Sequence, residues 1–151
     1  MATVSAVPAF LDALRSALVS NVELVGVYIY TADVPLQDRG MESICVNGQV
    51  TSKEEAGNLS GTLREERIIV PMAAMTSNVG TDLETAVSGA RSRCFALVEA
   101  VESLRDSDFT CDATVTDWQI TDRKLYQGMV PDVGMVNQIT FTLSVLASFT
   151  P

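Results

Sequence analysis

The feature that most constrains the fold is a long apolar periodicity that begins just after residue 80. Thr81 and Glu84 have the spacing of a capping box, in which a hydroxyl and a carboxylate bind free N–H groups at a helix start. Apolar residues then recur at steps of three and four: Leu83, Val87, Ala90, Cys94, Leu97, Val98, Val101 and Leu104. This pattern predicts an amphipathic helix over residues 82–105, about 35 Å long at roughly 1.5 Å per residue.

The sequence that follows this helix is typical of β-strands. Residues 109–116 alternate between apolar side chains and threonine or aspartate, which predicts a half-buried strand. The apolar phase then slips to Trp118 and Ile120, which indicates a β-bulge near Asp117.

The C-terminal region has the clearest alternation in the chain. After an expected turn region over residues 121–134, a strand is predicted over residues 139–149, and only Leu146 breaks its alternation. One side of this strand is apolar and the other is threonine- and serine-rich. The polar side either faces water or meets a neighbouring copy.

Three more elements are predicted upstream. Apolar spacing over residues 7–19, with Pro8 near the start, indicates a helix that ends at Ser20-Asn21. Residues 22–30 are rich in β-branched and aromatic side chains and read as a central strand. Residues 67–75 are strand-like too, but Pro71 cannot donate to a ladder, so an edge position or a bulge is expected there.

Residues 31–66, which we call the excursion, contain four glycines and a charged stretch at Lys53–Glu55. Only residues 44–50 suggest a short hairpin. We therefore expect a long, partly mobile loop, and loops of this length in compact domains tend to be functional. The excursion is predicted to contact an adjacent subunit or ring.

Together these patterns predict one α+β domain over residues 1–151, because 151 residues suit a single core. The sheet is expected to be mostly antiparallel, since its later strands are amphipathic. The N-terminal helix and the long central helix should pack on one face of it, with the excursion as a long loop or hairpin.

Composition excludes several classes of function. The net charge of −9 disfavours sequence-specific binding of DNA or RNA, because such a chain repels phosphate. The sequence has no histidine, which removes the commonest general base and every Ser/His or Cys/His nucleophile pair. We expect neither an enzyme nor a cofactor.

The cysteines and the N-terminal residues bear on the cellular compartment in which the protein folds. Cys45, Cys94 and Cys111 are odd in number and outside any CxxC pair, so we expect buried free thiols and no structural zinc. No apolar run is long enough to span a bilayer, and the first ten residues lack a basic n-region. No membrane association or export is expected.

Acidic clusters are the nearest approach to a catalytic or metal site. Asp106, Asp108 and Asp112 match no calcium loop and are best explained as a solvated turn. Carboxylates at positions 54, 55, 65 and 66 indicate a solvated face or a partner contact. The glycosylation sequon at 58–60 is expected to be unused, and residues 78–81 fit helix capping better than anion binding.

The remaining candidates are contact residues. Arg123, Lys124 and Tyr126 form one basic and aromatic spot, which suits a subunit contact or a turn better than a phosphate backbone. Trp118 is either an interface anchor or a core residue. The predicted subunit or partner contacts are Arg39, Lys53, Glu54, Glu55, Arg64, Trp118, Arg123, Lys124 and Tyr126.

The order of elements resembles a known family. An N-terminal amphipathic helix and a strand precede the segments RIIVPMAAMT, TDLETAVSGARSRCFALVEAVESL, CDATVTDWQI and QITFTLSVLASF. Over residues 7–149 this layout resembles the tail terminator proteins of long-tailed bacteriophages, in which a strand leads into a long helix and two β segments close the domain.

The resemblance implies a hexameric ring that caps the finished tail tube, stops its polymerisation and joins it to the head-side connector. It implies three partners: further copies of this chain, the tail tube protein and a head-closure or connector protein. DNA would pass through the lumen without specific binding. The location would be the neck of the virion, after assembly in the host cytoplasm.

Other functions remain open at this stage. Within the same class, the chain could be another neck component, such as a head-closure or adaptor protein, or a tail tube subunit. In a different class, it could be a small-molecule binding module or an accessory protein. A deep pocket joining Asp112, Asp117 or Tyr126 would be the sign of a binding module.

Overall fold

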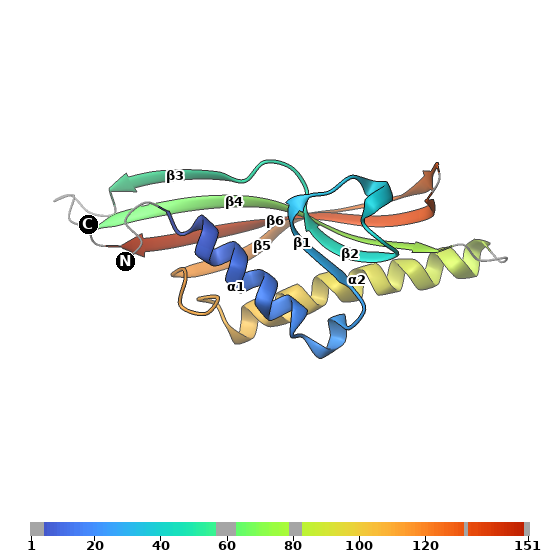
Figure 1. Ribbon diagram of the computed structural model, residues 1–151, viewed down its shortest axis with the longest axis horizontal. Helices are drawn as coiled ribbons and strands as arrows, with labels where there is room; N and C mark the ends of the chain where they lie inside the picture. Colours follow the sequence, from blue (N-terminus) through green and yellow to red (C-terminus); the bar gives the residue numbers. More distant parts are fainter. Residues whose placement is uncertain (1–4, 57–62, 79–82, 132, 150–151) are drawn as a thin grey trace.

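The computed structural model describes residues 5–56, 63–78, 83–131 and 133–149. Within these residues the chain forms two α-helices, two short 3₁₀ helices and six strands (Figure 1). In chain order they are α1 (Val7–Val19), η1 (Val22–Leu24), β1 (Tyr28–Asp33), η2 (Leu36–Asp38), β2 (Glu42–Val46), β3 (Thr51–Ala56), β4 (Arg64–Asn78), α2 (Leu83–Ser107), β5 (Asp117–Val130) and β6 (Gly134–Phe149).

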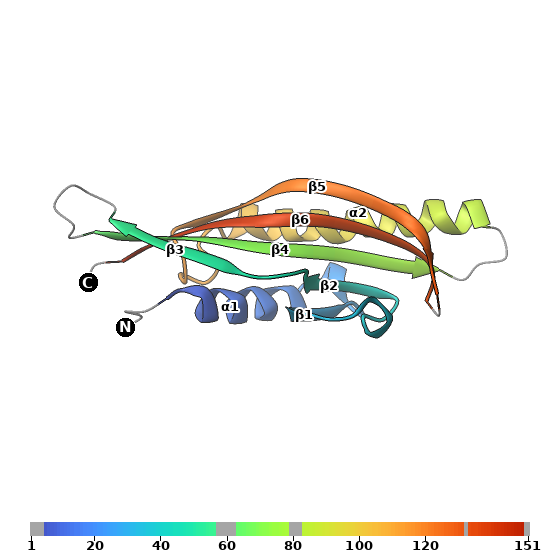
Figure 2. The ribbon, with the colours of Figure 1, turned by 90° about the horizontal axis from the view of Figure 1, so that it is seen from above.

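All six strands belong to one sheet, with the order β1-β2-β4-β6-β5. β3 lies off this path, because it pairs with the first half of β4 while β2 pairs with the second half. Only the pairing of β1 with β2 is parallel. The three longest strands, β4, β5 and β6, run the length of the molecule side by side (Figure 2). The predicted α+β class with a mostly antiparallel sheet is confirmed.

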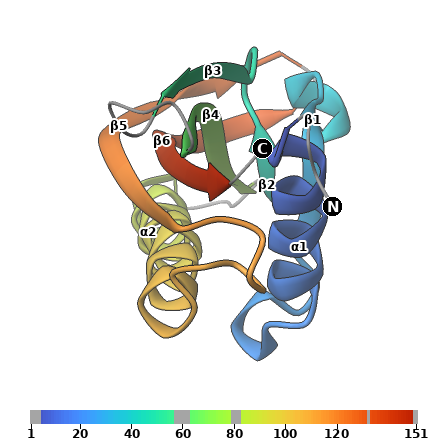
Figure 3. The same cartoon turned by 90° about the vertical axis from the view of Figure 1, so that its left-hand side faces the viewer.

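Both helices lie on the same face of the sheet, as the view along the sheet shows (Figure 3). We call this the helix face and the opposite side the open face. Alternate residues of β4 and β6 point to the helix face and are buried: Ile68, Val70, Met72, Ala74, Ile139, Phe141, Leu143, Val145 and Ala147. From α1, Phe10 packs edge-on against Trp118 of β5, with 6.0 Å between ring centroids.

α1 begins and ends where its sequence predicts, but its N-terminus is stabilised from outside the helix. The N-cap residue, Ala6, has no side chain able to accept a hydrogen bond. Instead, the carboxylate of Glu66 on β4 accepts from the Ala6 N–H at 2.7 Å and from the Ser5 hydroxyl at 2.6 Å. The expectation that Glu66 belongs to a solvated or partner-contacting face is therefore wrong.

α2 confirms the predicted long helix and continues two residues further, to Ser107. Its buried face contains Cys94, Leu97, Val98 and Val101, as the periodicity predicts. The capping-box residue Thr81 lies outside the described residues.

The predicted central strand over residues 22–30 is wrong in both extent and position. Residues 22–24 form η1, which begins where the Asn21 side chain accepts from the Glu23 N–H at 2.9 Å. Gly26 then adopts a φ of +83°, which is not a strand conformation, so the strand can start only after Gly26. β1 begins at Tyr28 and lies at one edge of the sheet.

The excursion is mostly strand rather than loop. β2, β3 and the start of β4 occupy much of it, and residues 57–62 lie outside the described part. The predicted hairpin over residues 44–50 is wrong, because β2 and β3 do not pair with each other. They lie one after the other along the same side of β4.

Pro71 lies in the middle of a central strand, contrary to the predicted edge position or bulge. Its carbonyl accepts from the Asn47 N–H at 2.8 Å. A strand residue directs its N–H and C=O to the same side, so the missing N–H of Pro71 points to the gap between β2 and β3. No ladder hydrogen bond is lost there.

Residues 109–116 form a turn, not the predicted half-buried strand. Cys111, Asp112 and Ala113 have φ between 45° and 60°, the left-handed region. The Asp108 carboxylate stabilises this conformation by accepting from the Asp112 N–H at 2.8 Å and the Thr110 hydroxyl at 3.1 Å. Such local bonds compete with strand pairing.

The C-terminal hairpin is longer than predicted. β5 continues to Val130 and so occupies residues 121–130 of the expected turn region, and β6 begins five residues before the predicted strand start. The register shift lies between Thr121 and Lys124, with Asp122 at φ 55°, and not near Asp117. The alternation of β6 from Ile139 onward is confirmed.

Candidate interaction surface

The described part of the chain holds no group of three or more histidine, cysteine, aspartate or glutamate side chains arranged to hold a metal ion. Asp108 and Asp112 do line a cleft of about 590 Å³ beside α1, together with Asp12. However, Asp108 is engaged in the turn described above. Asp106 lies apart from them and pairs loosely with Arg105 at 3.8 Å.

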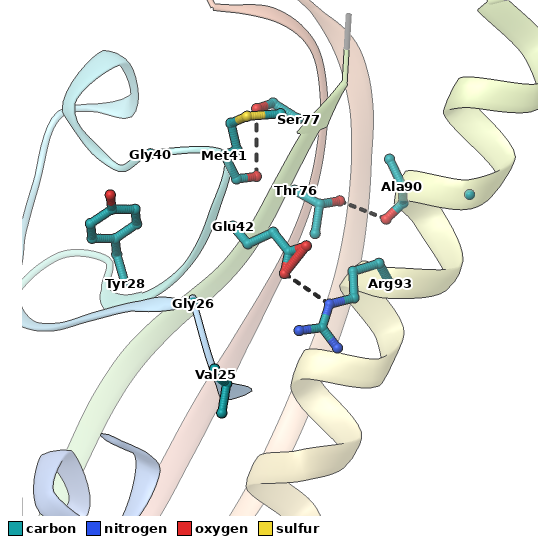
Figure 4. Close-up of a pocket in the computed structure, with 11 residues that line it drawn as sticks. Val25, Gly26, Tyr28, Gly40, Met41, Glu42, Thr76, Ser77, Ala90 and Arg93 are labelled. Carbon is teal, nitrogen blue, oxygen red and sulfur yellow. Dashed lines mark hydrogen bonds and ion pairs between the residues drawn. The ribbon is translucent and has the colours of Figure 1, made fainter. Parts of the chain in front are cut away.

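A larger cleft, of about 800 Å³, lies between α2, the start of β1 and the start of β2 (Figure 4). We call it the α2 cleft. Three apolar residues stand on its rim with unusually exposed side chains: Val25 at 79%, Tyr28 at 56% and Met41 at 62%. Val19, the last residue of α1, and Val22, the first residue of η1, are also exposed. Large apolar groups gathered in this way mark interaction sites more often than isolated ones do.

The floor of the α2 cleft is small and its polar groups are paired. Arg93 of α2 binds the Glu42 carboxylate at 2.8 Å and the Glu23 carbonyl at 3.2 Å. The Thr76 hydroxyl donates to the Ala90 carbonyl at 2.6 Å (Figure 4). Beside Ala90, Gly89 has nothing within 4 Å of where a Cβ would stand. The cleft therefore offers apolar surface with its charges already neutralised.

A second exposed apolar surface lies on β5, at the opposite edge of the sheet from β1. After the bulge, residues 125–130 carry no charge. Leu125 and Met129, on the helix face of β5, and Tyr126, on its open face, are all exposed. We call residues 125–130 the hairpin end. Among the described strands β5 pairs only with β6, so the outer backbone groups of this segment form an open edge.

The predicted contact residues fall into three groups. On the β3–β4 pair, Lys53, Glu54 and Arg64 are exposed and Glu55 is half-buried. Arg123, Lys124 and Tyr126 are exposed on β5. The structure brings neither group near the α2 cleft, which is lined by other residues.

Ion pairs on the β3–β4 pair are surface interactions. Arg64 lies 3.7 Å from Glu54, and Arg67 lies 2.8 Å from Glu55. The hydrogen bond from Arg67 lowers the pKa of the Glu55 carboxyl. Pairs this exposed contribute little to stability, so these charges are available to a partner.

The third group is buried. Trp118 is fully enclosed in the core and donates from Nε1 to the Asp108 carbonyl at 3.0 Å, which fits the core alternative. Arg39 is 4% exposed and folds over the open face, where Nε donates to the Val34 carbonyl at 2.6 Å and Nη1 to Gln138 Oε1 at 3.2 Å. Both side chains are satisfied within the chain and are not available for a partner contact.

Sequence reasoning missed the α2 cleft. Its rim residues follow or precede Gly26 and Gly40, whose φ values of +83° and +81° turn the chain away from the sheet. The sequence does contain a signal for this cleft: apolar residues stand next to glycines that interrupt a strand-like run. The predicted central strand over residues 22–30 includes Val25 and Tyr28, and Met41 lies in the excursion.

The three cysteines are free and buried, as expected. Burial raises the pKa of the Cys94 thiol to about 11 and of the Cys111 thiol to about 12, and it raises the pKa of Cys45 as well. Thiols that stay protonated are poor nucleophiles and poor metal ligands. They act here as small core residues.

In the described part of the chain, the two clefts above do not join Asp112 with Asp117 or Tyr126: Asp112 lines only the cleft beside α1. Asp117 and Tyr126 are nine residues apart on one strand, on the order of 25 Å. Asp117 is hydrogen-bonded to Arg105 at 3.0 Å. None of Asp112, Asp117 and Tyr126 lines the α2 cleft.

Within the described residues, no helix is both long enough and apolar enough to cross a membrane. No protein-family model matches the sequence, and no curated protein matches it. Among solved structures, the chain is similar to a chain of the "Virion of native gene transfer agent (GTA) particle", with 12% sequence identity and a TM-score of 0.46. That likeness covers 95% of this chain and 98% of the other.

Proposed function

We propose that this chain is a structural virion protein, a tail terminator that forms a ring on the end of a phage tail tube. The observation that carries the proposal is the sheet itself, which has an open edge on each side, β1 at one and β5 at the other. Two different edges on one subunit favour a head-to-tail contact, and such contacts close into rings when the rotation permits.

The sequence resemblance supports the same function. The resemblance to tail terminators rests on the N-terminal helix, the strand expected after it, and four segments that contribute to β4, α2, β5 and β6. In the segment CDATVTDWQI, residues 111–116 form a turn and only residues 117–120 belong to β5. A tail terminator works through its surfaces, and the described part of this chain offers exposed sheet edges and an apolar cleft. The ring is proposed to be a hexamer that joins the tail tube to a head-closure or connector protein.

The open face suits the wall of a DNA channel. β6 contributes Thr140, Thr142, Ser144 and Ser148 to this face, and β4 contributes two charges of opposite sign, Glu65 and Arg67. With a net charge of −9 on the whole chain, such a surface would let DNA pass without holding it. A ring with a strongly basic inner wall would contradict this part of the proposal.

The exposed residues of β3 and β4 are proposed to contact the adjacent ring. Lys53, Glu54, Glu55 and Arg64 lie on a strand pair that projects at one end of the molecule (Figure 1). Reversing two of these charges, with Lys53→Glu and Arg64→Glu, should weaken binding to the neighbouring ring without unfolding the chain. Unchanged binding would remove these residues from the interface.

The test is to mix the purified protein with candidate tail tubes and image them by negative stain. Density at one end of each tube is the expected result. Binding along the whole tube would indicate a tube subunit, and binding only to a head-side connector would indicate a head-closure or adaptor protein. Absence of binding to any tail or neck component would overturn the proposal.

A further inference from the structure

The hairpin end and the α2 cleft are two unpartnered apolar surfaces on one chain. In the hairpin end, Leu125 is 40% exposed and Met129 is 62% exposed on the same face of an edge strand with free backbone groups. Edge strands are normally protected by charge, and β5 follows that rule only up to Lys124. Beyond Lys124, residues 125–130 carry no charge that would oppose association with another chain.

The α2 cleft is complementary to the hairpin end in its chemistry. Its rim is apolar, and its one internal charge pair, Glu42 with Arg93, is already formed. The hairpin end brings no charge of its own. Contact between the two surfaces would therefore bury apolar area without leaving an unpaired charge out of water.

The floor of the cleft gives a separate indication. Gly89 lies in the interior of α2, where glycine is less favourable than alanine by about 1 kcal/mol. Nothing within the described chain stands close enough to require a glycine there. A residue without a side chain at this point is explained if another chain approaches the helix closely.

A hairpin end that fills this cleft must come from another copy of the chain. The hairpin end is on β5, whereas the cleft is bounded by the starts of β1 and β2, and these strands lie toward opposite edges of the sheet. One chain cannot fill its own cleft without breaking the sheet. A contact from the β5 side of one subunit to the β1 side of the next is head-to-tail, the arrangement that a ring requires.

We propose that the hairpin end of one copy docks in the α2 cleft of the next, with Leu125 and Met129, which share one face of β5, against Val25, Tyr28 and Met41. This inference rests on the proposed ring and identifies the surfaces that form it. The other apolar surfaces, including Val22 on the connection between α1 and β1, would lie at the margin of the contact.

Cross-linking between two single-cysteine variants tests the contact directly. Met129→Cys and Met41→Cys replace exposed side chains, and the native cysteines are buried. A short bismaleimide should join the two variants when they are mixed, and the double variant should give a ladder of oligomers. Asp12→Cys, exposed on α1, replaces Met129→Cys in the control mixture.

Blocking the cleft gives a second, independent readout. Gly89→Leu places a side chain in open space, so the fold is expected to persist, while subunit association should fall about tenfold or more because the hairpin end is excluded. Gly89→Ala, which adds one methyl group, should retain helix stability and weaken association less. Circular dichroism checks that both variants are folded.

The outcomes separate this contact from the proposed function. Tube capping without cross-linking above the control would overturn the contact and leave the terminator function standing. Cross-linking without tube capping would support the contact and remove the terminator function. Cross-linking of Met129→Cys to the tail tube protein instead, or Gly89→Leu associating as well as the unaltered chain, would overturn the contact.

Discussion

Glu66→Ala should destabilise the chain far more than a typical glutamate substitution. The Glu66 carboxylate is 2% exposed and accepts two short hydrogen bonds at the N-terminus of α1, at 2.6 and 2.7 Å. It supplies the cap that Ala6 cannot, and it carries a negative charge where the helix dipole favours one.

The magnitude follows from these contacts. Hydrogen bonds to a charged group contribute about 1.5–3 kcal/mol each, and the helix dipole adds up to about 2 kcal/mol in a partly buried site. The cost of burying the carboxylate offsets part of this sum, and the terms overlap. We expect Glu66→Ala to lower the free energy of unfolding by about 2–3 kcal/mol, or the Tm by roughly 5–10 °C.

The assay is urea unfolding of dilute protein, at concentrations where the midpoint does not depend on concentration. Hydrogen exchange should also speed up selectively at the first turns of α1, because those amides lose their tertiary anchor. Glu66→Gln keeps an acceptor oxygen and should cost about 1 kcal/mol.

Glu65→Ala is the matched control. Glu65 immediately precedes Glu66 on β4 and points to the open face, where its ion pair with Arg67 is long, at 3.9 Å. Its loss should change stability by less than about 0.5 kcal/mol. If Glu66→Ala and Glu65→Ala unfolded at the same urea concentration, the capping role of Glu66 would be refuted.

Three further perturbations test other parts of the fold. Arg105→Ala removes two hydrogen bonds that join the end of α2 to β5, at 2.7 and 3.0 Å, and should cost about 1–2 kcal/mol in urea unfolding; a neutral result would contradict the contact. Gly40→Ala should cost at least about 1 kcal/mol, because φ is +81° and the new Cβ would stand 2.6 Å from the Tyr28 ring; a stabilised variant would show that the turn is wrong. Because their pKa values are raised, the Cys94 and Cys111 thiols stay protonated in the folded chain above about pH 9, where the thiols of the unfolded chain ionise. The contribution of the two thiols to stability should therefore be constant below about pH 8, and stability should fall from about pH 9 towards pH 11 by about 1.4 kcal/mol per pH unit for each thiol; a flat profile between pH 9 and 11 would contradict their burial.

The helices were predictable because each carries a continuous periodic signal. Both α1 and α2 lie within two residues of the ranges that their apolar spacing predicts. The alternation of β6 was equally clear. These elements bury one face against a single core, so local pattern and tertiary packing agree.

The strands of the first half were harder to predict because non-local pairing decides them. Residues 51–56 are almost entirely polar, yet they form β3 because the first half of β4 offers them a partner. Residues 109–116 alternate well but form a turn, since side-chain bonds of Asp108 outweigh the alternation. Strand propensity depends strongly on such context.

The candidate surface was predicted only in part. Exposed charges on β3 and β5 are visible in sequence, whereas burial of Arg39 depends on acceptors up to 99 residues away. The α2 cleft joins residues from four separate segments, and no linear pattern connects them. A sequence can show that Val25 and Met41 are apolar, but only the fold shows that they are exposed.

The most direct test of the proposed function is the growth of tail tubes. Tubes would be preincubated with this protein, supplied with fresh tail tube subunits, and measured for length by electron microscopy over time. A tail terminator predicts that preincubated tubes stop lengthening while untreated tubes continue to grow. Growth at the same rate with and without the protein, at concentrations that saturate the tube ends, would contradict the function proposed for this chain.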